Sequence, residues 1–251
     1  MRFPCFVLVL SCSIIWESCA QTVKSSDCNP PDHSVWSALL QANVDENGGV
    51  NYQGFVNDSS KLNSYLAELS SCYPTDNWNK EEKLAYWINA YNAFTIKLIL
   101  DYYPVQSIKD IKRGIPFVNS VWDIEFFKIG SAKMDLNEIE HSILRKEFDE
   151  PRIHFAIVCA SKSCPRLLNE AYQPQQLEKQ LELQARNFIN DSTKNELIAK
   201  EIRVSSIFKW FKGDFTENGT LQMFIQKYSE QNILPNAKVS YLEYDWSLNG
   251  E

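Results

Sequence analysis

Two cysteines and one histidine lie close together in the second half of the chain. Cys159 and Cys164 flank the short segment Ala-Ser-Lys-Ser, and His154 lies just before Cys159. A cysteine attacks as its thiolate, and a neighbouring imidazole helps to form that thiolate. This segment predicts a Cys–His catalytic pair, with His154 as the base and Cys159 or Cys164 as the nucleophile. Its chemistry would be hydrolysis or acyl transfer at amide or thioester bonds.

The elements that carry these residues limit how they meet. The nearly continuous apolar run 153–159, IHFAIVC, predicts a short buried strand. Residues an odd number apart on a strand point to opposite faces, so His154 meets Cys159 only if the strand bends. Cys164 follows in a loop that can fold back over the His154 face. His141, from the preceding predicted helix, is the alternative partner of Cys159.

Asn89 and Asn92 are candidate substrate-binding residues. They lie one turn apart on the longest predicted helix, among aromatic residues. Buried amides need hydrogen-bond partners, so the two side chains either line a pocket or bond neighbouring backbone. Asn89, Asn92 or Glu140 is also a candidate for orienting the imidazole of the catalytic pair.

The N-terminus predicts export. Arg2 precedes an apolar run at 3–15, and Ser18-Cys19-Ala20 places small residues before a cleavage point at Gln21. We therefore predict a signal peptide at 1–20 and a secreted or extracellular protein. A lipid attached at Cys19 is a lesser alternative.

Cleavage at that point leaves Cys28, Cys72, Cys159 and Cys164. An even number of cysteines in an exported chain favours disulfides, and we predict Cys28–Cys72 and Cys159–Cys164. The competing interpretation leaves one cysteine of the second pair free, as the catalytic pair requires. A redox-active disulfide is a third interpretation, although this pair lacks the short Cys-x-x-Cys spacing.

Composition excludes several classes of function. The 251 residues carry 25 Lys and Arg against 32 Asp and Glu, a net charge of −7 that argues against a nucleic-acid partner. No segment after the signal is apolar enough to span a bilayer.

Glu138 and His141 share a helix face, but no second ligand pair accompanies them, so we predict no metal and no cofactor. The expected partner is a small-molecule or peptide ligand.

Asn-x-Ser/Thr sequons begin at Asn57, Asn190 and Asn218, all in polar surroundings, and predict a glycoprotein.

Helical and strand patterns alternate without βαβ regularity. We predict helices over 59–72, 80–103, 137–148, 174–189, 205–211 and 221–228, and strands over 124–129, 132–136, 153–159, 197–204 and 239–246. The first two strands form a hairpin. This mixture predicts an α+β single domain of amphipathic helices packed on a small mixed or antiparallel sheet. A polar arm at 21–33 precedes a domain at 34–251.

Several segments together resemble one family. They are YWINAYNA at 86–93, LNEIEHSILR at 136–145, PRIHFAIVCAS at 151–161 with Cys164-Pro165, SIFKWF at 206–211 with Asp214-Phe215, and YLEYDWSL at 241–248. The chain resembles the DUF547 family of uncharacterised proteins, which occurs in bacteria, animals and plants. The resemblance covers about residues 35–248 and implies no catalytic residues. The alternative to an enzyme is a non-catalytic, disulfide-stapled extracellular binding module.

Overall fold

The computed structural model describes residues 28–112 and 120–250. The predicted signal peptide and most of the predicted arm lie outside these residues. The described chain is an α+β domain, as predicted. It is mostly helical and has two small sheets where the sequence predicts one.

Helix α4 (Lys80–Tyr102) runs through the larger of two apolar clusters. It begins at Asn79, whose side chain accepts the backbone N–H of Glu82 while the Glu82 carboxylate accepts the N–H of Asn79. These two hydrogen bonds form a capping box. The helix ends just before Pro104, since the residue before a proline is disfavoured in the helical conformation. Most of its residues are buried, so α4 is a central helix with neighbours on several sides.

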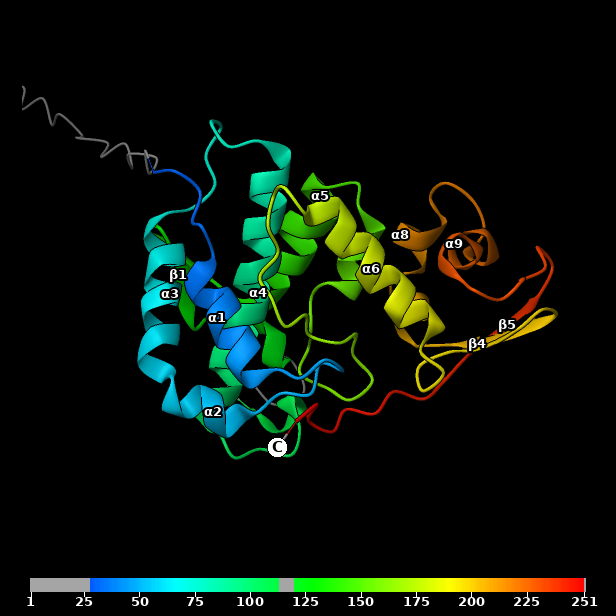
Figure 1. Ribbon diagram of the computed structural model, residues 1–251, viewed down its shortest axis with the longest axis horizontal. Helices are drawn as coiled ribbons and strands as arrows, with labels where there is room; N and C mark the ends of the chain where they lie inside the picture. The colour runs from blue at the N-terminus through cyan, green and yellow to red at the C-terminus, as the bar shows by residue number, and fades with distance from the viewer. Residues whose placement is uncertain (1–27, 113–119, 251) are drawn as a thin grey trace, which may run out of the picture.

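The remaining helices of the larger cluster pack around α4 (Figure 1). Helix α3 lies where the sequence predicts a helix and buries one apolar face, made of Leu62, Tyr65, Leu66 and Leu69. The Cys28–Cys72 disulfide is confirmed and ties the start of the described chain to the end of α3. The helices on this side of the molecule are α1 (Ser34–Asn43), α2 (Tyr52–Asn57) and α3 (Ser59–Ser71).

The smaller apolar cluster lies at the other end of the molecule (Figure 1). Helix α6 passes between the two ends and contributes apolar residues to both clusters. The helices here are α6 (Leu177–Asn190), α7 (Ile207–Trp210), α8 (Lys212–Thr216) and α9 (Leu221–Tyr228).

The two sheets are short. Strands β1 (Phe127–Ile129) and β2 (Ala132–Met134) form the predicted antiparallel hairpin. The predicted strand 197–204 is instead two strands, β3 (Glu196–Ile198) and β4 (Glu201–Val204), which pair antiparallel. Strand β5 (Lys238–Tyr241) pairs parallel with β4 and ends earlier than predicted. This second sheet is therefore mixed.

The strand predicted at 153–159 is wrong. The segment begins as the 3₁₀-helix η4 (Pro151–Phe155) and continues as a turn. An apolar run that is buried on all sides fits a buried helical turn as well as a buried strand. Here Pro151 stands at the start of the helix, and the Glu150 carboxylate accepts the backbone N–H of Arg152, which favours the helical turn.

The segment predicted as one helix at 137–148 contains two types of helix. Residues Glu138–Leu144 form the π-helix η3, and Arg145–Glu147 continue as α5. Short π-helical turns are rare and are frequent at functional sites. The short 3₁₀-helices η1 (Ile108–Asp110) and η2 (Val121–Asp123) complete the helical elements.

After β5 the chain returns across the molecule to α2 (Figure 1). Along the way the backbone N–H groups of Lys162 and Ser163 donate to the carbonyls of Ser247 and Asp245. Near the end, Val50 N–H donates to the Asn249 carbonyl at 3.1 Å. The C-terminal segment thus fixes the position of the loop that contains Cys164.

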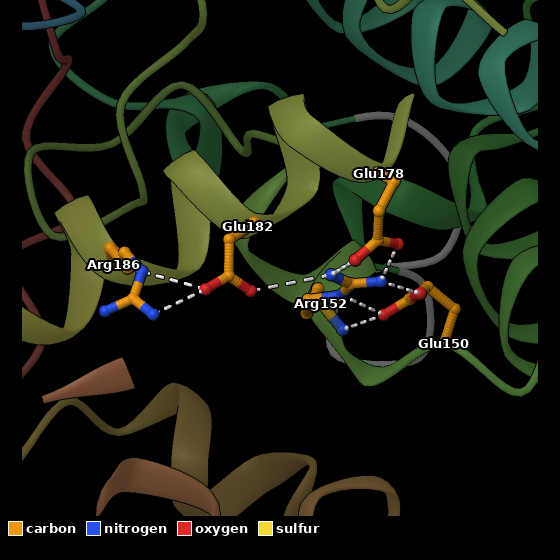
Figure 2. A network of polar contacts seen from close by, with 5 residues as sticks. All are labelled: Glu150, Arg152, Glu178, Glu182 and Arg186. Carbon is orange, nitrogen blue, oxygen red and sulfur yellow. Dashed lines mark hydrogen bonds and ion pairs between the residues drawn. The ribbon is translucent and has the colours of Figure 1, made fainter. Parts of the chain in front are cut away.

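A buried arginine holds η4 against α6 (Figure 2). The guanidinium of Arg152 donates to both carboxylate oxygens of Glu150 at 2.7 and 2.6 Å and to both of Glu178 at 2.7 Å. Glu182 lies 3.8 Å from the same guanidinium and pairs with Arg186. Since His154 is on η4, this network fixes the position of the histidine backbone.

Candidate functional site

A pocket of about 180 Å³ opens between η3, the turn after η4, α7 and the C-terminal segment. Its polar and sulfur-containing lining consists of Asn137, Glu140, His141, His154, Cys159 and Cys164. Its aromatic lining consists of Tyr91, Trp122, Trp210, Phe211, Tyr244 and Trp246. The structure therefore brings all three predicted catalytic candidates to one cavity.

Cys159 and Cys164 are joined by a disulfide, as the predicted pairing requires. Ser161 Oγ and Tyr244 Oη each lie 3.2 Å from Cys159 Sγ, and they lie 3.4 and 3.3 Å from Cys164 Sγ. A bridged sulfur is not a thiolate. In this oxidised form the predicted cysteine nucleophile is therefore masked.

His154 is oriented by an acid that the sequence analysis did not select. Its Nε2 lies 2.7 Å from Asp214 Oδ2, and its ring stacks on Phe211 at 3.9 Å between centroids. None of the predicted orienting residues, Asn89, Asn92 or Glu140, hydrogen-bonds this imidazole in the described chain.

The other ring nitrogen of His154 is left without a partner. Nδ1 is buried and makes no hydrogen bond within residues 28–112 and 120–250. Because the Asp214 carboxylate accepts from Nε2–H, Nδ1 of the neutral ring carries a lone pair. Burial lowers the pKa of His154, which favours that neutral form.

The Asp214 carboxylate accepts hydrogen bonds from both Arg145 and His154. Arg145 donates to its two carboxylate oxygens through Nε and Nη2, at 2.6 and 2.8 Å. These hydrogen bonds, together with that from His154, lower the pKa of Asp214 well below its ordinary value. Arg145 Nη1 also lies 3.1 Å from His141 Nδ1. Since a guanidinium only donates, His141 accepts at Nδ1 and carries its proton on Nε2.

Glu140 is the one carboxyl group among the described residues that line the pocket. It is 8% exposed and accepts a hydrogen bond from the Tyr91 hydroxyl at 3.3 Å. Burial raises the pKa of Glu140 to about 7. Near neutral pH this side chain therefore exists in both protonation states and can either donate or accept a hydrogen bond.

Asn89 and Asn92 bond backbone and do not line the pocket. Asn89 donates to the Tyr172 carbonyl at 2.8 Å and accepts its N–H at 2.9 Å. Asn92 donates to the carbonyl of Ala156 and accepts the N–H of Val158, both at 2.9 Å. Of the two expected roles, lining a pocket or bonding backbone, both amides have the second. The oxygen and the nitrogen of each side chain are hydrogen-bonded to buried loop backbone.

Asp214, Arg145 and Tyr244 are site residues that the sequence motifs did not predict. Asp214 and Tyr244 lie within segments that carry the family resemblance, but their distance along the chain from His154 and Cys159 hid the contacts. Their position within those segments is the signal that could have identified them as site residues.

Among the described residues, no group of three or more His, Cys, Asp or Glu is arranged to hold a metal ion. No helix in residues 28–112 and 120–250 has the length and apolar character of a membrane span.

The side chains of Asn190 and Asn218, which begin two of the three sequons, differ in accessibility. The Asn190 amide donates to the carbonyls of Arg186 and Tyr228 and accepts the N–H of Glu230, so a glycan on Nδ2 would break packed contacts. Asn218 is exposed, and we therefore expect glycosylation there rather than at Asn190.

Comparison with known families finds one match. Residues 75–189 match the family model described as "Protein of unknown function, DUF547". This part of the chain is a DUF547 domain. It includes α4, η3, η4, both pocket cysteines and α6, whereas Asp214 and Tyr244 lie beyond the matched residues. No curated protein and no solved structure matches the chain.

Proposed function

We propose that this DUF547 protein is exported and binds a small organic ligand in the pocket beside the Cys159–Cys164 disulfide. The observation that carries this proposal is that His154 lines an aromatic pocket while its buried Nδ1, an acceptor, has no hydrogen-bond partner among the described residues. An unpaired buried polar group costs about 1–3 kcal/mol, and a ligand donor at that position would recover part of this free energy. Export is supported by the two disulfides, which are typical of oxidising compartments.

Pocket size and lining restrict the ligand. A cavity of about 150 Å³ accommodates benzene, so one of about 180 Å³ suits a single ring with few substituents. Trp210 and Tyr244 offer ring faces, with centroids 4.7 Å apart at the pocket. The ligand class is therefore a planar ring, free or as a peptide side chain, that bears an N–H or O–H donor.

Titration of the pocket tryptophans with single-ring compounds tests the proposal. Phenol and imidazole should quench tryptophan fluorescence saturably, and benzene, which has no donor, should bind more weakly. His154→Phe keeps a ring but removes Nδ1, so it should weaken phenol binding about tenfold, the loss of one hydrogen bond in a dry site. Met223→Ser, at an exposed position outside the pocket, is the matched control. Equal binding by the wild type and His154→Phe, or no saturable binding by either, would overturn the proposal.

A second candidate is a cysteine-dependent hydrolase or acyltransferase that acts after reduction. The favouring observation is that Cys159 and the Asp214-paired His154 line the same pocket, and these are the residue types of a Cys–His–Asp set. The reduced protein should then hydrolyse members of thioester and peptide panels, and Cys159→Ala should abolish this activity. Activity that survives in both Cys159→Ala and Cys164→Ala would exclude the cysteine mechanism.

A further inference from the structure

We propose that the Cys159–Cys164 disulfide is a thiol–disulfide exchange site, at which an incoming thiolate attacks Cys159 Sγ and Cys164 leaves. The substrate class is a small thiol with an apolar body that enters the aromatic pocket. This inference concerns the disulfide itself and needs neither the proposed ligand nor acyl transfer.

The two sulfurs differ in access. Cys159 is partly exposed, whereas Cys164 is 3% exposed, and both line the pocket. Exchange needs a line of approach to one sulfur, and accessible disulfides are the labile ones. Access therefore selects Cys159 as the sulfur that is attacked.

The surroundings of Cys164 suit a leaving thiolate. The backbone N–H of Cys159 donates to Cys164 Sγ at 2.9 Å. The hydroxyls of Ser161 and Tyr244 lie 3.4 and 3.3 Å from the same sulfur and 3.2 Å each from Cys159 Sγ, so they can stabilise either thiolate and the backbone N–H is the contact that favours Cys164. Hydrogen bonds to a charged form stabilise that form, and a better-stabilised thiolate leaves faster.

The loop is held so that the bridge can re-form. The Cys164 N–H donates to the Ser161 carbonyl at 3.0 Å, and Asn249 N–H donates to the Ala160 carbonyl at 3.1 Å. With Lys162 and Ser163 also bonded to the C-terminal segment, opening the disulfide leaves both thiols at high effective concentration. Cys164 can then attack the mixed disulfide on Cys159 and release the thiol.

The reaction balances without a further redox partner. A thiolate RS⁻, which has lost its proton to solvent, forms an S–S bond to Cys159 as the Cys159–Cys164 bond breaks. Cys164 thiolate then takes a proton from solvent. A second RS⁻ attacks the RS sulfur of the mixed disulfide, the bond from that sulfur to Cys159 breaks, RSSR is formed, and Cys159 leaves as a thiolate that takes a proton from solvent. Two thiols are thereby oxidised while one protein disulfide is reduced.

The Cys28–Cys72 disulfide provides an internal reference, since it does not line this pocket. The full chain, purified without reductant, is incubated with benzyl mercaptan or glutathione, quenched with acid, alkylated and mapped by peptide mass. We expect the adduct on Cys159, an alkylated Cys164 and an intact Cys28–Cys72 bridge. Cys28 and Cys72 are also partly exposed, so access alone does not separate the two bridges. Because the aromatic pocket would hold the thiol beside Cys159, opening at the pocket should be at least about tenfold faster than at the reference, with benzyl mercaptan ahead of glutathione. Adduct on Cys164, or equal opening rates for the two bridges, would overturn the proposal.

A hydroxyl substitution tests the stabilisation of Cys164. Tyr244→Phe keeps the ring but removes the hydroxyl near both sulfurs, and should slow pocket opening about threefold to tenfold. Tyr241→Phe, nearby and outside the pocket, should leave the rate unchanged. An unchanged rate in Tyr244→Phe would remove the proposed role of this hydroxyl, and the mapping on wild-type protein would still decide the site of attack. Binding of phenol to the oxidised protein is a separate measurement, so failure of either proposal is distinguishable from failure of the other.

Discussion

His154 Nε2 lies 2.7 Å from Asp214 Oδ2, and this contact joins two residues that are 60 positions apart. It links η4, inside the DUF547 match, to α8, beyond it. The acid also holds Arg145, which in turn contacts His141. One carboxylate therefore organises both pocket histidines.

Asp214→Asn should destabilise the protein by about 2 kcal/mol, because it removes a charged acceptor from Arg145 and His154. Because the folded-state pKa of Asp214 is lowered, its stabilisation is present above the ordinary value of 3.8 and is lost as pH falls below it. Urea unfolding at pH 7 and pH 3 measures both effects. The difference between wild type and variant should shrink at pH 3. Glu217→Gln, at an exposed position nearby, is the control, and an equal loss in both variants would contradict the prediction.

Glu140→Gln should stabilise the protein above neutral pH. Burial raises the folded-state pKa of Glu140 from 4.5 to about 7, so ionisation is disfavoured in the native state. Its contribution is therefore most favourable below pH 4.5 and is lost as pH rises through about 7, a change of about 3 kcal/mol. Glu140→Gln should remove this fall in the free energy of unfolding, measured by urea titration between pH 5 and 8. Glu138→Gln, exposed on the same helix, is the control, and the same pH slope in wild type and Glu140→Gln would refute the expectation.

Arg152→Met should cost about 3 kcal/mol of unfolding free energy, because Glu150 and Glu178 lose a guanidinium whose side chain is only 9% exposed. Arg186→Met changes an exposed member of the same network (Figure 2) and should cost less than about 1 kcal/mol. Chemical denaturation compares the two variants. Equal losses of unfolding free energy in the two variants would contradict the prediction that burial makes the Arg152 ion pairs more stabilising than that of Arg186.

Asn92→Ala should destabilise the protein by about 2–3 kcal/mol, since the carbonyl of Ala156 and the N–H of Val158 both lose their partner in the interior. The turn that leads to Cys159 should also loosen, which hydrogen exchange at Val158 would detect. Asn63→Ala, exposed on α3, is the matched control. Protection of Val158 equal to that in the wild type would contradict the assigned role.

Local signals in the sequence determined much of the fold. Asn79 and Glu82 specify the start of α4 through a capping box, and the apolar spacing of α3 specifies its buried face. The even number of cysteines in a chain predicted to be exported indicated disulfides, and the predicted Cys28–Cys72 and Cys159–Cys164 bridges, one of three possible pairings, are confirmed. The helix start and the buried face depend on residues a few positions apart.

Tertiary structure decided what the site contains. The segment 153–159 has no periodicity that separates a strand from a buried helical turn, and packing against α6 through Arg152 selects the turn. The Asp214 partner of His154 and the Tyr244 hydroxyl beside the sulfurs come from distant segments, which no local pattern places together. Long-range packing sets those contacts, and it also leaves His154 Nδ1 buried with no partner in the described chain.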